Sequence, residues 1–194
     1  EEFYSHKIKY GIGKNNIISK SAKIHSNIYI GNNCIIGDNV EIEEGTIILN
    51  NVVISENVKI GKYCTIKSGA IIGEIGFGYS ANEKNESIRV PHFGGVIIGD
   101  NVDIGAGTVS GVLRFDDQNT VHQIKGRKEI PANGANATYL GDYVRTGVNV
   151  IFQPGVMVGT NSIVGSGTIL LENVPSNKLV YAKQEIIERD WGSR

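Results

Sequence analysis

The sequence predicts an all-β solenoid, a coil built from very short strands, and three observations indicate this fold. Isoleucine occupies ten consecutive sixth positions, from Ile18 to Ile72. From Ile24 onward, a small or branched residue stands two positions before each of these isoleucines, as Cys34 does before Ile36. Gly, Asn or Asp commonly follows the isoleucine. A fixed period is the sequence mark of a repeat architecture, and the repeat here is a hexapeptide.

Each hexapeptide fits one short strand and one corner. Side chains two residues apart point to the same side of a strand, so every repeat carries two inward residues. Gly, Asn and Asp suit the corners because they tolerate a left-handed backbone. Three strands per turn would make a triangular prism in which residues three hexapeptides apart stack, as Val40 on Val58 and Asn39 on Asn57. We therefore expect a dry interior lined by the sixth-position isoleucines.

The repeat is interrupted twice, and each interruption predicts a loop outside the coil. The register is lost after Ile72 and again after Ser110. We expect residues 74–95 and 112–137 to form these loops. Long loops in compact folds are usually functional, so we look for the chemistry there.

The predicted organisation is one coil domain followed by a tail. The domain covers residues 1–174 and includes both loops, and the tail covers residues 175–194. Within the tail we expect a closing strand and then a short helix between residues 178 and 190.

Composition excludes several classes of function. The net charge is −1 and the basic residues are scattered, so no nucleic-acid partner is expected. No segment approaches the ~20 apolar residues of a membrane span, so no membrane association is expected. Cys34 and Cys64 are expected on different faces as small buried residues, which fits a reducing cytoplasm. No two histidines have the spacing of a zinc site, so no metal is expected.

Beyond the hexapeptides, local motifs resemble two enzyme families. Gly76 to Tyr79 and Arg89 to Asp100 resemble the N-acyltransferase of lipid A biosynthesis, which acylates the amine of a UDP-sugar. A second set of motifs resembles the acetyltransferase domain of the bifunctional glucosamine-phosphate acetyltransferase and uridyltransferase enzymes. This set consists of Asp103 to Thr108, Leu113 to Asp117, Leu140 to Asp142, Thr146 to Val150, Pro154 to Val156, and Val174-Pro175 with Lys178 to Val180. The chain as a whole looks like a hexapeptide-repeat acyltransferase.

The resemblance implies a left-handed parallel β-helix that works as a homotrimer and uses acyl-CoA, with acetyl-CoA favoured, as a co-substrate and no tightly bound cofactor. The implied reaction is N-acylation of a nucleotide-linked amino sugar for surface polysaccharide synthesis. Two departures are clear: the catalytic histidine of the lipid A family corresponds to Pro154, and an asparagine of the archaeal bifunctional enzymes corresponds to Val112. Two alternatives stay open, an O-acetyltransferase acting on a sugar or small molecule and a non-catalytic solenoid that binds a partner.

Acyl transfer from a thioester to an amine needs a group that takes the proton of the attacking nitrogen. Histidine suits this role because its pKa lies near the operating pH. Among the four histidines, His92 is the candidate general base, because Pro91 before it and Gly94-Gly95 after it turn the chain out of the coil. The alternative is a loop histidine bonded to backbone.

The remaining candidate residues bind the two substrates. The resemblance implies that four residues bind the cofactor: Gly147, Gly165, Ser166 and Lys183. A backbone amide at the corner would donate to the pantetheine arm or to the thioester oxygen, and the Lys183 cation would pair with a phosphate. The loops supply Phe77 and Tyr79 to stack a ring, Arg114 to pair a phosphate, Asp116 and Asp117 to hold a hydroxyl or amine, and His122 as a further ligand. The alternatives are ordinary corner glycines, a solvated lysine, and aromatic residues that attach a loop to the coil.

Overall fold

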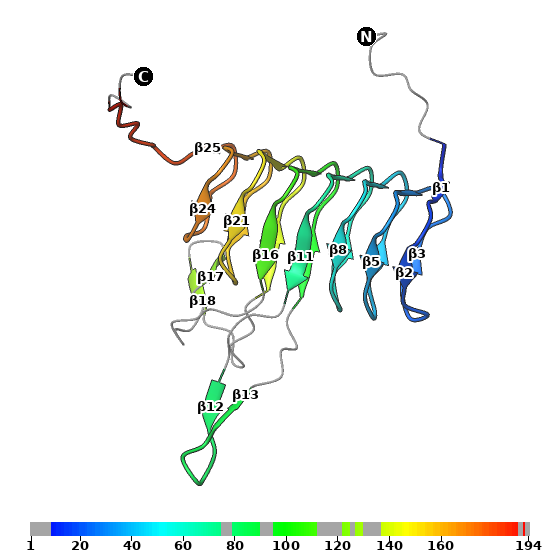
Figure 1. Cartoon of the computed structure of the whole chain (residues 1–194), viewed down its shortest axis with the longest axis horizontal. Coiled ribbons are helices and arrows are strands. Elements are labelled where there is room, and N and C mark those ends of the chain that lie inside the picture. Colours follow the sequence, from blue (N-terminus) through cyan, green and yellow to red (C-terminus); the bar gives the residue numbers. More distant parts are fainter. Residues whose placement is uncertain are drawn as a thin grey trace.

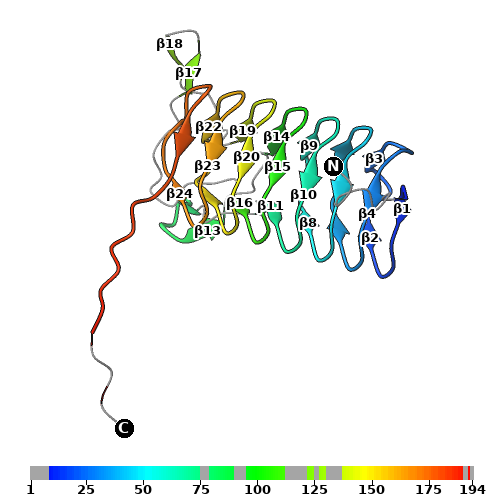
Figure 2. The same cartoon turned by 90° about the horizontal axis from the view of Figure 1, so that it is seen from above.

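A computed structural model gives the fold and confirms the predicted all-β class, a left-handed parallel β-helix of hexapeptide repeats. It describes residues 9–74, 79–89, 95–111, 122–124, 127–129, 137–189 and 192. Figure 1 shows the coils side by side along the long axis of the molecule, and Figure 2 shows the same stack from above.

Three parallel sheets form the three faces of the prism, and successive strands pass from one sheet to the next. Sheet A contains β1 (Gly11–Ile12), β4 (Tyr29–Ile30), β7 (Ile47–Ile48), β10 (Thr65–Ile66), β15 (Asp103–Ile104), β20 (Arg145–Thr146), β23 (Ile163–Val164) and β25 (Leu179–Val180). Sheet B contains β2 (Ile17–Ile18), β5 (Ile35–Ile36), β8 (Val53–Ile54), β11 (Ile71–Glu74), β16 (Val109–Gly111), β21 (Ile151–Phe152) and β24 (Ile169–Leu170). Sheet C contains β3 (Lys23–Ile24), β6 (Glu41–Ile42), β9 (Lys59–Ile60), β14 (Val96–Ile98), β19 (Thr138–Leu140) and β22 (Met157–Val158).

The predicted stacking register is confirmed. Ile24 pairs with Ile42, and Ile42 pairs with Ile60, one coil further along in each case. At a corner, the side-chain amide of Asn39 donates to Asn57 Oδ1 at 3.3 Å. The φ angles of these two asparagines are 54° and 60°, the left-handed conformation for which the corner composition is suited.

The interior is lined as the repeat predicts. The inward isoleucines from Ile30 to Ile72 are buried, and so are both cysteines, which are free thiols. Cys34 precedes β5 of sheet B and Cys64 precedes β10 of sheet A, so the two lie on different faces as expected.

Within the described residues, each predicted interruption contains a short antiparallel hairpin that belongs to none of the three coil sheets. The first hairpin pairs β12 (Tyr79–Ala81) with β13 (Ser87–Arg89), and the second pairs β17 (His122–Ile124) with β18 (Arg127–Glu129). The coil closes behind each excursion, because β9 pairs directly with β14 and β14 pairs directly with β19. In Figure 1 the first hairpin lies well below the coil.

The tail begins as predicted and then departs from the prediction. β25 adds a parallel strand to β23 in sheet A, so the closing strand is confirmed. Residues 181–189 form no helix, so the predicted short helix is wrong over this segment. The reason is physical: so short a segment cannot offset the cost of helix nucleation without packing, and Ile186 and Ile187 are 86% and 70% exposed. Over the described part of the chain, no helix is long and apolar enough to span a membrane.

Candidate functional site

The two excursions leave the coil from one corner, the B–C corner between sheets B and C. The first leaves after β11 and the second after β16, and these strands are neighbours in which Glu74 pairs with Gly111. The returning strands are neighbours as well, because Val96 pairs with Thr138. The fold therefore places the roots of both loops in adjacent coils, as walls of one site require.

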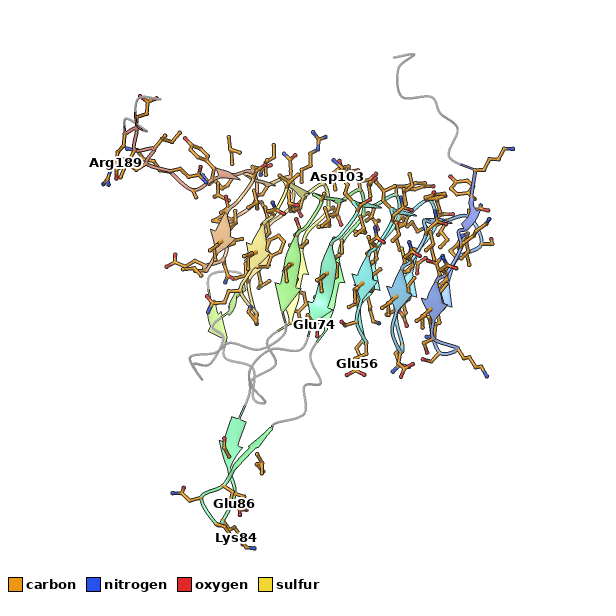
Figure 3. The ribbon with its side chains drawn as sticks, viewed as in Figure 1. Glu56, Glu74, Lys84, Glu86, Asp103 and Arg189 are labelled. Carbon is orange, nitrogen blue, oxygen red and sulfur yellow. The ribbon has the colours of Figure 1, made fainter. Side chains whose placement is uncertain are left out.

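Sequence reasoning did not single out Glu74, which occupies this corner. Figure 3 shows Glu74 at the lower end of β11, where the first excursion leaves. Its side chain is exposed, and its neighbours Gly111 and Pro154 follow in the next two coils. Its position in the sequence could have indicated it, because Glu74 comes shortly after Ile72, the last sixth-position isoleucine before the first loop. Glu74 thus brings a carboxylate to the root of the loops.

The structure places only part of the predicted substrate set. Tyr79 begins β12 and His122 begins β17, so the backbone of each lies on one of the two hairpins. Phe77, His92, Arg114, Asp116 and Asp117 lie outside the described residues. The roles of all seven remain predictions.

The predicted cofactor residues come together at a second corner, the A–B corner between sheets A and B. Gly147 follows β20 and Gly165 follows β23, the next strand of sheet A. A Cβ on Gly147 would collide with Ser166 of the next coil, and one on Gly165 would lie 2.7 Å from Cβ of Tyr181. Both glycines are therefore needed for close stacking of the coils, whatever they bind.

Lys183 lies in the segment that leaves this corner. It comes two residues after Tyr181, and its side chain is exposed. The backbone N–H of Ala182 donates to the Thr168 hydroxyl at 3.3 Å, which ties the start of the tail to the last full coil. The segment that carries Lys183 therefore starts at the same corner as Gly165 and Ser166.

Corner amides in this fold are often capped by a polar side chain of the next coil. The N–H of Lys14 donates to Asn32 Oδ1 at 2.7 Å, and the N–H of Asn32 donates to Asn50 Oδ1 at 2.8 Å. Near the other end of the A–B corner, the N–H of Val148 donates to the Ser166 hydroxyl at 3.2 Å. The polar residues at these corners therefore hold neighbouring coils together.

Other amides of the A–B corner have no such cap among the described residues, namely those of Asn50, Ser68 and Ser166. β23 pairs with β25 so that Ile163 faces Leu179, which places Ala182 above Ser166. Alanine has no acceptor, and the Ser166 N–H has no hydrogen-bond partner among the described residues. The Ala106 amide in the same corner is likewise uncapped over that part of the chain, because Val148 stands in the next coil. This corner therefore presents free donors to a ligand.

A groove of about 770 Å³ lies on the outer side of sheet C, over the strands that follow the two excursions. Ile97, Tyr139 and Met157 form its floor, and Pro175 and Ser176 border it. Sequence reasoning missed this groove because it followed only the inward residues. The groove lies beside β14 and β19, the strands to which the two excursions return.

Two side chains of the coil have shifted pKa values. Burial raises the pKa of the Cys64 thiol to about 11, and its Sγ donates to the Gly99 carbonyl at 3.1 Å. Hydrogen bonds from Lys23 and Lys59 lower the pKa of Glu41 on the outer side of sheet C. Within the described ranges, no three His, Cys, Asp or Glu residues gather as a metal site would require.

Two family models match most of the coil. The bacterial transferase hexapeptide model (six repeats) matches residues 10–43 and 39–74, and the hexapeptide repeat of succinyl-transferase matches residues 85–109 and 134–172. The chain belongs to the hexapeptide-repeat acyltransferase superfamily. The matches leave out residues 75–84 of the first excursion and residues 110–133, which include most of the second.

Individual relatives agree with this assignment. The bifunctional protein GlmU of Methanococcus maripaludis strain C5 is 40% identical over 184 residues, which cover 89% of this chain and 44% of that protein. The UDP-3-O-acylglucosamine N-acyltransferase of Shewanella denitrificans is 34% identical over 107 residues, which cover 55% of this chain and 24% of that protein. This hexapeptide-repeat chain thus spans less than half the length of these curated relatives.

A solved structure supports the fold. The crystal structure of the polySia-specific acetyltransferase NeuO superimposes with a TM-score of 0.51 at 22% identity, covering 94% of this chain and 84% of that one. At this level of sequence identity, the structural similarity supports the hexapeptide-repeat fold alone.

Proposed function

We propose that this chain is an acyl-CoA-dependent N-acyltransferase whose acceptor is the amine of a nucleotide-linked amino sugar. The superfamily supports acyl transfer, and the name of the Shewanella relative specifies an acyl acceptor nitrogen on a UDP-sugar. The single observation that carries the proposal is the pair of uncapped amides of Ala106 and Ser166 at the A–B corner, on either side of the capped Val148 amide. An extended chain that carries carbonyl groups, such as pantetheine, could accept hydrogen bonds from donors placed along the coil in this way.

In this proposal acyl-CoA lies along the A–B corner in the C-terminal coils. The free N–H of Ser166 donates to the pantetheine arm or to the thioester oxygen. A donor aimed at that oxygen stabilises the negative charge that develops on it during attack. Lys183, exposed on the segment that leaves the corner, would pair with a phosphate of the cofactor.

The acceptor would bind among the two excursions. Phe77 and Tyr79 would stack on a ring, Arg114 would pair with a phosphate, and His122 with Asp116 or Asp117 would hold polar groups of the sugar. The amine nitrogen attacks the thioester carbon, the carbon–sulfur bond breaks, and CoA leaves as the thiol. His92 takes the proton from nitrogen and returns one to the leaving sulfur, so protons balance over the reaction.

The distance between the two corners favours a site shared by more than one copy of the chain. The A–B corner and the B–C corner lie on opposite borders of sheet B, and six steps along the chain, from Gly147 to Gln153, separate them within one coil. At about 3.3 Å per residue this span approaches 20 Å. We therefore place each complete site between two chains of a cytoplasmic homotrimer, with the corner from one and the loops from another.

Two measurements test the proposed function. Calorimetry should show saturable binding of acetyl-CoA, and purified protein should acetylate UDP- or dTDP-linked amino sugars with release of free thiol. Mass spectrometry of the product after treatment with periodate or mild alkali then shows whether the acetyl group is held as an amide, which is stable to alkali, or as an ester. An ester would favour the O-acetyltransferase alternative. Absence of acyl-CoA binding by the assembled protein would leave the non-catalytic binding module as the better account.

A further inference from the structure

Seven hydroxyl side chains are buried inside the described part of the coil, and five of them bond to the backbone of a neighbouring coil. The Thr46 hydroxyl donates to the Gly61 carbonyl at 2.8 Å, and the Ser162 hydroxyl donates to the Pro175 carbonyl at 3.0 Å. Backbone groups also bond to the other three, which are Thr108, Thr146 and Thr168. All five lie beside the A–B corner or the C–A corner, the corner between sheets C and A.

Ser110 and Thr138 are the two exceptions. These residues are 2% and 0% exposed, and neither hydroxyl oxygen has a hydrogen-bond partner among the described residues. Buried polar groups in folded proteins are nearly always paired with protein or with an ordered water, so an unpaired one requires an explanation. Both exceptions lie at the third corner, the B–C corner from which the excursions leave.

The two hydroxyls flank this corner from inside a single coil. Ser110 ends sheet B in that coil and pairs with Ile72 of the preceding one, while Thr138 begins sheet C and pairs with Val96 of the preceding one. Ile72 and Val96 are buried and aliphatic although the first excursion lies between them. Leaving the coil therefore does not by itself require hydroxyls, and the polar pair calls for a specific partner.

The position of Ser110 offers room for such a partner. The three preceding coils carry isoleucine at this place, namely Ile36, Ile54 and Ile72. Serine has two non-hydrogen atoms fewer than isoleucine, and the space they would fill is on the scale of a water molecule, which takes about 30 Å³ in the liquid. Phe152 stands at the same place in the following coil and closes the site on that side.

The balance of costs favours a bound water over two unpaired hydroxyls. One unsatisfied buried hydroxyl lowers the ratio of folded to unfolded chain by about thirtyfold at the middle of the usual range. Immobilising a water molecule lowers the same ratio by about thirtyfold at most. Since one water can serve both hydroxyls, binding it costs less than leaving the pair without a partner.

We propose that one water molecule is bound inside the coil between the hydroxyls of Ser110 and Thr138. The water forms a hydrogen bond with each and so joins the two ends of the second excursion, which carries His122. It supplies a link across the corner at the place where the chain itself leaves the coil. This hydration site is independent of the proposed function, because it concerns the support of a loop and not the reaction.

A double-mutant cycle distinguishes a hydrated corner from a dry one. Ser110→Ala and Thr138→Val each remove one hydroxyl with little change of shape. With a bridging water, each single variant should lower the ratio of folded to unfolded chain by about fivefold or more. The double variant should lose much less than the product of the two factors, because the second substitution removes a group that has already lost its partner. Urea unfolding at one fixed chain concentration measures all four proteins.

Ser162→Ala is the matched control. It removes a buried hydroxyl whose direct bond to Pro175 needs no water, so its loss should multiply with that of Thr138→Val. In a dry corner, Ser110→Ala and Thr138→Val would each remove an unpaired hydroxyl. Both would then raise the ratio of folded to unfolded chain and their effects would multiply, a result that would overturn the proposal.

A crystal structure of the whole chain provides a second test that needs no substitution. It should show a peak of density about 2.5–3.0 Å from the hydroxyl oxygens of both Ser110 and Thr138. A direct bond between the two hydroxyls, or no density between them, would contradict the inference. Neither measurement uses acyl transfer, so a dry corner would leave the proposed function untouched.

Discussion

The Ser166 hydroxyl accepts the N–H of Val148 at 3.2 Å, while the N–H of Ser166 faces Ala182 and has no acceptor among the described residues. Ser166 therefore caps the amide of the preceding coil with its side chain, while its own amide has no cap from the following coil. This asymmetry places a free donor on the last full coil, beside the point where Lys183 departs.

The open amide can be removed without touching another side chain. Ser166→Pro and Ser166→Ala both lose the hydroxyl that caps Val148, but only proline also loses the N–H. Gly167 follows with a φ of 67°, so this turn suits proline at the preceding position. Because a lost hydrogen bond costs about 1–1.5 kcal/mol, the KM for acetyl-CoA should rise about tenfold in Ser166→Pro relative to Ser166→Ala. Equal KM values would show that the amide does not contact the cofactor.

Gly147 should be required for stability independently of any ligand. Gly147→Ala would drive its Cβ into Ser166, which overpacks the corner and should lower the free energy of unfolding by about 1–3 kcal/mol. Gly111→Ala is the control, because its Cβ would lie 3.5 Å from Cγ of Pro154, an ordinary contact, and the change should stay within about 1 kcal/mol. Urea unfolding measures both. Equal stabilities of the two variants would argue against the close contact.

The role of His92 is tested by kinetics. As general base it should contribute about 10²–10⁴ to kcat, so His92→Ala should lower kcat by that factor with an unchanged circular dichroism spectrum. The acid limb of the kcat–pH profile should disappear with it. A loss below about tenfold would exclude this assignment and favour a base supplied by the substrate.

Cys64 predicts a loss of stability at alkaline pH. Its pKa is raised from 9.0 to about 11 by burial, so the unfolded chain releases its proton first as the pH rises. The contribution of the neutral thiol to stability is complete below pH 9 and falls progressively between pH 9 and about 11, by up to about 1.4 kcal/mol per pH unit. Denaturant unfolding at several pH values should show a shallower decline in Cys64→Val than in the wild type. Parallel curves would contradict the prediction.

Sites shared between chains should allow two inactive variants to restore activity together. His92→Ala lacks the proposed base and Ser166→Pro lacks the corner amide, so each homo-oligomer should be impaired. Co-expressed chains would form some sites with an intact corner from one variant and intact loops from the other. Activity above the sum of the two separate variants is expected. Simple additivity would place the corner and the loops of each site on one chain.

Much of the fold could be predicted because the decisive signal is local. Alternation along a strand determines that Ile36 and Cys34 point the same way, and the sixth-position spacing then locates each corner. The two losses of register marked the excursions, and the glycines of the A–B corner were recognised by their motifs. The helix predicted in the tail failed because no packing surface supports residues 181–189.

The site was less predictable because its parts come from different coils. The amide of Ser166 faces Ala182, which offers no side-chain acceptor, and that pairing spans 16 residues where a regular turn spans 18. The outward aliphatic residues Ile17, Ile35, Val53 and Ile71 of sheet B are visible in the sequence once three strands per turn are known. The pairing of Ile71 with Val109 depends on how the coil closes around the first excursion.

The sequence by itself determined the class of fold, the inward residues, the places where the chain leaves the coil, and the resemblance to acyltransferases. Tertiary structure alone decided that both loops arise at one corner and that Gly147 and Ser166 meet at another. The physical reason is that strand alternation acts over neighbouring residues. Stacking joins residues 38 and 42 positions apart wherever an excursion intervenes, a separation that no local pattern encodes.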